Sequence, residues 1–168
     1  MVKKKFKSLD ELELYLQKNV MQIISKNASI ERILAETMSQ AVFKYVYDAY
    51  EPTQYERRED DGGLADQKNM FITDFGIRDG SVFLTFENLT QGQTNQSPIY
   101  GRSQDSLDGK YIGDTIEFGI KDNWYDSSGE WAMPRPFAEE TVKELNANPT
   151  ELLDALRAAL TKRGFTVN

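Results

Sequence analysis

An apolar stripe at helical spacing, from Ile30 to Ala49, constrains the fold more than any other feature of the sequence. Its members recur every three or four residues: Ile30, Ile33, Leu34, Met38, Ala41, Val42, Tyr45, Val46 and Ala49. This spacing predicts an amphipathic helix of about five turns with one buried face. Such a stripe is typical of a hydrophobic core rather than of a cofactor site. Pro52 is expected to end the helix, because proline cannot continue the hydrogen-bond ladder.

A shorter helix is predicted upstream of this stripe. Ser8-Leu9-Asp10-Glu11 has the pattern of a capping box, with Ser8 as the cap and Glu11 three residues later. Asn27-Ala28-Ser29 is expected to separate the two helices, because Asn and Ser side chains compete for backbone hydrogen bonds. The apolar positions between these two signals are Leu9, Leu12, Leu16, Val20, Ile23 and Ile24.

Strand patterns occupy the middle of the chain. The stretch from Met70 to Phe75 alternates, and Asp79-Gly80 is a strong hairpin turn signal, so an antiparallel hairpin is predicted. One face of the first strand would carry Phe71, Thr73 and Phe75, and the far strand would carry Val82, Leu84 and Phe86. A third strand is expected over Tyr111 to Ile120, with Ile112, Ile116, Phe118 and Ile120 on one face.

Two helices are expected to close the chain. The first begins after the run Trp131 to Phe137, in which two prolines flank Arg135 and hold the backbone extended. The second begins at Asn148-Pro149-Thr150-Glu151, with Asn148 as the cap, and stops at Lys162-Arg163-Gly164.

The element order predicts an α+β fold. A long N-terminal amphipathic helix packs on a small antiparallel β-sheet, and two C-terminal helices complete a single domain over residues 1–168. Residues 88–110, from Asn88 to Lys110, are rich in Gln, Asn, Ser and Gly and are predicted to form a long polar loop or arm.

The composition excludes much of enzyme chemistry. The chain has no cysteine and no histidine, which removes disulfides, thiolate nucleophiles, Cys/His zinc sites and the commonest general base. We therefore expect no enzyme, no cofactor and no metal. A metal-dependent hydrolase stays open as an alternative, because carboxylates are frequent between Glu56 and Asp66, although their spacing matches no EF-hand.

Charge and hydropathy limit the partners. The net charge of −7 argues against a nucleic-acid-binding surface, and the basic residues from Lys3 to Lys7 are expected to be a solvated tail. No apolar run follows them, so no secretory signal is predicted, and no stretch is long enough to span a bilayer. An acidic surface would suit a passage that DNA crosses without binding.

Two segments contain the residue types that are enriched at protein interfaces, tyrosine, tryptophan and arginine. We consider them candidate subunit or partner contacts: Tyr50, Pro52, Tyr55, Arg57, Arg58, Trp131, Arg135 and Phe137. We also expect Phe137 to be buried and the Arg135-Pro136-Phe137 segment to set the angle at which the C-terminal helices pack. Core burial of Tyr45, with the two consecutive arginines neutralising the acidic stretch, is the alternative interpretation of the first segment.

Three features together resemble the tail-completion or head–tail joining (neck) proteins of long-tailed bacteriophages, often called minor capsid proteins. They are Ser8 to Leu12 opening a helix, the tyrosine, proline and arginine passage from Tyr47 to Arg58, and Arg135-Pro136-Phe137 before a closing amphipathic helix. Where many members have a Thr-Gly-x-Leu turn, this chain has the longer, acidic run Glu59 to Leu64.

The resemblance implies a structural virion protein at the head–tail junction, assembled in the host cytoplasm. It further implies a homo-oligomeric ring, sixfold or twelvefold, that contacts other head, neck and tail proteins and lets DNA pass, with no role at a membrane. The alternative is an acidic host-directed interaction module that imitates DNA.

Overall fold

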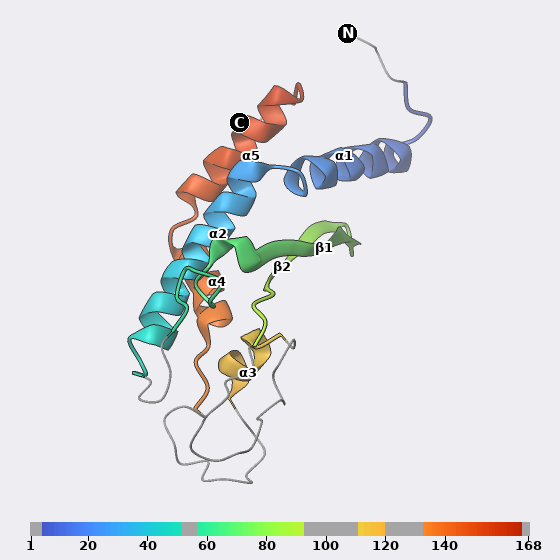
Figure 1. Cartoon of the computed structure of the whole chain (residues 1–168). Coiled ribbons are helices and arrows are strands. Elements are labelled where there is room, and N and C mark those ends of the chain that lie inside the picture. The colour runs from blue at the N-terminus through green and yellow to red at the C-terminus, as the bar shows by residue number, and fades with distance from the viewer. Residues whose placement is uncertain (1–4, 52–56, 93–110, 120–132, 166–168) are drawn as a thin grey trace. The chain divides into compact units, whose positions relative to one another are not determined.

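The computed structural model describes residues 5–51, 57–92, 111–119 and 133–165 (Figure 1). Helices α1 (Leu9–Ile24) and α2 (Ala28–Val42) come first, and a π-helical segment, Phe43–Tyr47, extends α2. A 3₁₀ turn, Gln67–Asn69, precedes strands β1 (Met70–Arg78) and β2 (Ser81–Asn88). Helices α3 (Gly113–Phe118), α4 (Phe137–Ala147) and α5 (Thr150–Lys162) follow. The α+β class is confirmed.

The chain divides into two compact units that are each assembled from separate stretches. Unit 1 comprises Met1–Ile33, Ile72–Phe86 and Pro149–Asn168, and unit 2 comprises Leu34–Phe71 and Glu87–Asn148. Unit 1 therefore holds α1, α5 and most of the hairpin, whereas unit 2 holds α3 and α4. The single domain expected from the sequence stays a prediction.

The helix starts of unit 1 agree with the sequence. The Ser8 hydroxyl oxygen accepts a hydrogen bond from the Glu11 amide at 3.1 Å. The predicted break at Asn27 is also confirmed, because the Asn27 side-chain oxygen accepts from the Ser29 amide at 2.9 Å and begins α2. Within unit 1, α1 contacts α5, and the Gln17 amide donates to the Gly80 carbonyl of the hairpin turn at 3.2 Å.

The predicted hairpin is confirmed as a two-stranded sheet of β1 and β2. Its turn has φ of 51° at Asp79 and 76° at Gly80. Both residues are left-handed, as in the type I′ turns that match the twist of two-residue hairpins. Asp-Gly is a favourable pair here, because glycine adopts this conformation without strain.

The third strand predicted over Tyr111 to Ile120 is wrong. Residues Gly113–Phe118 form the short helix α3, and Tyr111 makes only an isolated antiparallel bridge with Gln91. The apolar residues Ile112 and Ile116 are four positions apart, which suits one helical turn as well as alternate strand positions. The Ile116 amide donates to the Ile112 carbonyl at 3.0 Å and so closes that turn.

The core of unit 2 is formed mainly by the predicted apolar stripe. Its buried residues on α2 and the π-helical segment are joined by side chains from three other stretches: Leu34, Ala35, Met38, Ala41, Val42 and Val46, with Leu64, Ala65, Met70 and Phe137. The helical stretch ends at Asp48, whose amide donates to the Phe43 carbonyl at 2.9 Å. Ala49 is consequently outside the helix and exposed, while Pro52 lies outside the described residues.

Both closing helices are present, with one difference at their junction. Asn148 does not cap α5; its side-chain amide donates to the Glu144 carboxylate at 2.6 Å at the end of α4. Only Asn148 and Pro149 connect the two helices, so Asn148 serves the preceding one. The predicted stop of α5 is confirmed, since Gly164 has φ of 87° and its amide donates to the Thr161 carbonyl at 2.9 Å.

None of the helices in the described part of the chain combines the length and hydropathy that crossing a bilayer requires.

Candidate functional site

Two segments that are distant in the sequence meet inside unit 2. The Arg135 guanidinium lies 4.8 Å from the centre of the Tyr50 ring. The Arg57 guanidinium lies 4.9 Å from the Tyr47 ring centre and 5.9 Å from that of Tyr50. These are cation–π distances, which are most favourable where the cation is desolvated. We call Tyr47, Tyr50, Arg57 and Arg135 the arginine–tyrosine cluster.

Arg57 is held by partners on the chain just before it. Its Nη1 donates to the Tyr47 carbonyl at 3.1 Å and lies 3.5 Å from the exposed carboxylate of Glu51. The side chain is largely buried, and its Nη2 has no hydrogen-bond partner among the described residues. The aromatic faces of Tyr47 and Tyr50 therefore add to the electrostatic stabilisation that Glu51 and the Tyr47 carbonyl give this cation.

The Arg135-Pro136-Phe137 segment lies in the interior of unit 2. Arg135 is 7% exposed and Phe137 is 2% exposed, so the predicted burial of Phe137 is confirmed. The Arg135 amide donates to the Ile116 carbonyl of α3 at 2.9 Å. This backbone hydrogen bond holds the residue before Pro136 against α3, so the start of α4 is fixed within unit 2.

The other interface candidates fall in different places. Arg58 is half-buried and donates to the Gln91 carbonyl at 2.7 Å. Tyr50 is half-buried in the arginine–tyrosine cluster. Pro52, Tyr55 and Trp131 lie outside the described residues. An interface role for the eight candidates stays a prediction.

A loop next to the arginine–tyrosine cluster was missed by sequence reasoning. In residues 58–66, which we call the Gly63 loop, three successive carbonyls accept hydrogen bonds from side chains of other segments. Gly63 accepts from Thr90 and from Asn69, both at 3.1 Å. Leu64 accepts from Asn88 at 2.7 Å, and Ala65 accepts from Ser39 at 2.8 Å.

The Tyr47 hydroxyl connects the Gly63 loop to the arginine–tyrosine cluster. It accepts a hydrogen bond from the Ala65 amide at 3.2 Å and donates to the Glu59 carbonyl at 3.5 Å. Burial raises the pKa of Tyr47, so the phenol keeps the proton that it donates. The cluster and the loop thus form one continuous polar network, which fixes the passage from Tyr47 to Arg58 at its two described ends.

The sequence contained one weak signal for this network. The Thr90 amide donates to the Asn88 side chain at 3.1 Å, which is an Asx turn. The pattern Asn-x-Thr is too common to predict an Asx turn from the sequence alone. Asn88 and Thr90 also belong to the stretch that was predicted to form a polar loop. Thr90 is instead completely buried.

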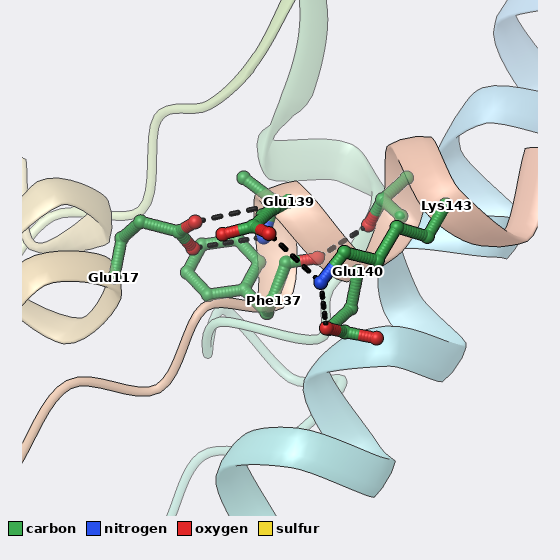
Figure 2. A network of polar contacts seen from close by, with 7 residues as sticks. Glu117, Phe137, Glu139, Glu140 and Lys143 are labelled. Atoms are coloured by element: carbon green, nitrogen blue, oxygen red, sulfur yellow. Dashed lines mark hydrogen bonds and ion pairs between the residues drawn. The ribbon is translucent and has the colours of Figure 1, made fainter.

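A second polar network positions the start of α4 (Figure 2). The buried Glu117 of α3 accepts hydrogen bonds from the Ala138 and Glu139 amides at 2.8 and 3.1 Å, one with each carboxylate oxygen. A carboxylate is favourable here because the first amides of a helix lack intrahelical partners and the dipole is positive. One turn further on, the Lys143 ammonium pairs with Glu139 and Glu140 at 2.8 and 2.7 Å; both carboxylates raise the pKa of Lys143.

We expect Glu117→Ala to lower the free energy of unfolding by about 2 kcal/mol, because two partly buried amides at the start of α4 lose their acceptors. Chemical denaturation of the purified protein measures this change. Asp114→Ala is the matched control, since Asp114 is an exposed acid on the same short helix. Equal losses in the two variants would contradict the capping role.

Asp66 gives the Gly63 loop a pH dependence. The hydrogen bond from the Lys68 amide, and then that from the Gly62 amide, hold the pKa of Asp66 below its ordinary value of 3.8. A lowered folded-state pKa contributes stability above the unfolded-state value that is lost as pH falls through the folded one. We expect Asp66→Asn to be less stable than the wild type at pH 7, and the difference in free energy of unfolding to narrow below about pH 4. An unchanged difference would contradict this account.

The described carboxylates do not converge on a metal site. No group of three or more His, Cys, Asp or Glu side chains in the described ranges is placed to hold an ion. Glu59, Asp60 and Asp61 are exposed, whereas both oxygens of Asp66 accept backbone hydrogen bonds. The hydrolase alternative gains no support from these residues.

Comparison with known proteins gives one family. The family model YomN matches residues 8–162. The SPbeta prophage-derived uncharacterized protein YomN of Bacillus subtilis (strain 168) is 28% identical over 144 residues, which cover 83% of this chain and 84% of that protein. No solved structure matches the chain.

Proposed function

We propose that the chain, which belongs to the YomN family, is a structural protein of a phage virion that forms part of the ring joining head and tail. The name of the Bacillus relative, which describes a prophage-derived protein, supports a phage origin. The finer assignment to tail completion or the neck depends on the resemblance described above and on the geometry of unit 2.

One observation carries the proposal. The two internal segments on which the resemblance depends are in contact, with Arg135 of one lying 4.8 Å from the Tyr50 ring of the other. The two sequence motifs therefore meet within unit 2 at this cation–π contact. A protein whose role is mechanical needs such a rigid element, because its contacts with neighbours must be held at fixed angles.

The proposed mechanism is mechanical and electrostatic, without a reaction or a cofactor. Subunits form a sixfold or twelvefold ring in the virion and dock on other head, neck and tail proteins. The net charge of −7 repels DNA phosphates over a Debye length of ~8 Å at physiological salt. DNA then passes through the ring without being retained by its wall.

The test is removal of the gene from an inducible prophage, followed by electron microscopy of the particles. We expect filled heads and separate tails that fail to join, or tails of faulty termination, and a loss of infectious titre. Supplying the wild-type gene in trans should restore joined particles. Normal infectious particles without the protein would overturn the proposal and favour the acidic host-directed module.

A further inference from the structure

The hairpin of unit 1 has an open edge along β1. Within the described residues, β1 and β2 form a two-stranded sheet with no third strand beside them. An edge strand presents unpaired backbone amides and carbonyls, with which another extended strand can pair. Proteins commonly block such an edge with lysine or proline. Neither residue type occurs in β1 from Ile72 to Arg78.

The turn determines which residues of β1 face outward. Arg78 directly precedes the two-residue turn and belongs to the hydrogen-bonded pair that closes it, so every second residue before it also bonds to β2. A Cβ atom at Gly76 would lie 2.8 Å from the Phe83 ring, which places both residues on one face, as this register requires. The residues whose amides and carbonyls point away from β2 are then Thr73, Phe75 and Ile77.

Exposure of the apolar face is greatest along the same edge. Phe75 is 44% exposed, and Thr73 beside it is also exposed. The residues across from them on β2 are half-buried: Val82, Leu84 and Phe86. The β1 side of this face is therefore the side that another strand would extend.

The Phe75 amide agrees with this outward direction. It donates to the carboxylate of the preceding residue, Asp74, at 2.8 Å, whereas an amide bonded to β2 would have a backbone carbonyl as its acceptor. Asp74 is exposed, so water competes for both groups and the bond is of small net value. A carbonyl of an added strand can replace this carboxylate.

The charges of β1 complement those of a second β1. When two copies run antiparallel about a two-fold axis at Gly76, Asp74 of each copy lies opposite Arg78 of the other. Both residues are exposed, and opposite charges at such positions are stabilising. The outward-facing Phe75 lies opposite Ile77, so their amides and carbonyls meet as hydrogen-bonded pairs. An aromatic residue opposite a β-branched one is also a favourable combination.

Neighbouring registers lack this complementarity. An axis at Phe75 places Asp74 opposite Gly76, and an axis at Asp74 places the two carboxylates opposite each other, which is unfavourable. In the register about Gly76, Asp79 of the turn lies opposite Thr73, so no like charges face each other directly. The sequence of β1 thus favours one alignment with its own copy.

We propose that the free protein forms a dimer in which β1 pairs antiparallel with β1 of a second copy, with Asp74 opposite Arg78. The two hairpins then form one continuous sheet, in which the backbone supplies hydrogen bonds and the side chains select the register. The contact is isologous and closes at two copies, so it does not itself build a ring. Such a dimer lies beyond the proposed function and depends only on the purified chain.

Charge reversal tests the register. Asp74→Arg or Arg78→Asp alone places like charges opposite each other, and we expect either to raise the dissociation constant of the dimer at least about tenfold. Mixing the two variants restores both opposite-charge pairs, so heterodimers should form within about threefold of the wild-type affinity. Sedimentation velocity measures the affinities, and native mass spectrometry separates heterodimers from homodimers. Lys18→Glu, a reversal at an exposed site on α1, is the matched control and should change the constant less than about twofold.

Amide hydrogen exchange locates the paired edge. Dilution of the wild type from dimer to monomer should speed exchange at Phe75 and Ile77, while Gly76, whose amide is bonded to β2, should change little. Concentration-dependent protection of Val82 and Leu84 instead would assign the contact to β2 and overturn the inference. A strictly monomeric wild type, or a mixture of the two charge variants that stays monomeric, would also overturn it.

Discussion

Phe137→Ala is expected to lower the free energy of unfolding by about 4 kcal/mol, because it removes a fully enclosed aromatic ring and leaves a cavity. Phe137 is the first residue of α4 and is 2% exposed. Its ring lies 4.0 Å from the position that a side chain at Gly113 would take, so it packs against the start of α3. Globular domains are stable by only about 5–15 kcal/mol, and a loss of this size would unfold a large fraction of molecules at moderate denaturant concentrations.

Val142→Ala is the control for this substitution. Val142 is on the same helix and exposed, so its truncation should change the free energy of unfolding by less than about 0.5 kcal/mol. Urea denaturation followed by circular dichroism measures both variants. A Phe137→Ala protein as stable as Val142→Ala would show that the Arg135-Pro136-Phe137 segment does not hold α4 in place.

Gly63→Ala should destabilise the protein by about 3 kcal/mol, because the added methyl group has no room. A Cβ atom at Gly63 would overlap the Glu59 carbonyl oxygen and lie 2.6 Å from the Glu59 amide nitrogen. Both atoms belong to the backbone, which cannot rotate away as a side chain could. The Gly63 loop would have to open, and its hydrogen bonds from Thr90 and Asn69 would be lost together.

Gly62→Ala separates this steric effect from the general cost of replacing glycine. Gly62 has φ of 75° and only the end of the Arg58 side chain nearby, at 3.9 Å. Its replacement should cost about 1 kcal/mol, the penalty for a left-handed alanine. Thermal unfolding gives the midpoint temperature of each variant, and we expect the lower value for Gly63→Ala. A lower midpoint for Gly62→Ala would contradict the packing described for the Gly63 loop.

The sequence predicted the elements whose signals are local. Ser8 and Asn27 lie at helix starts because their side chains accept nearby amides, and Asp79-Gly80 forms the hairpin because that turn requires left-handed residues. The stripe from Ile30 to Val46 is buried because its period matches the helix. Each of these outcomes depends on residues within a few positions of one another.

The sequence failed where distant segments decide the structure. Residues Gly113–Phe118 form helix α3 in place of the predicted third strand, and Glu117 accepts the first amides of α4, a contact that no local pattern encodes. Thr90 looked like part of a polar loop, yet it is completely buried, and the Gly63 carbonyl and the Asn88 side-chain oxygen are the acceptors within reach of its hydroxyl. The contact between the Arg135 guanidinium and the ring of Tyr50, far away in the chain, was likewise not predicted.

The interleaved order of the two units determines when each can form during synthesis. Every stretch of unit 2 lies between residues 34 and 148, whereas unit 1 requires residues 149–168 in addition to its earlier segments. Domains generally fold as they emerge from the ribosome, with earlier segments first. Here unit 2 has all its residues available before α5 is made, although α1 is synthesised first. Helix α1 must therefore wait for its contact with α5, and its leucines stay accessible to other chains throughout that interval.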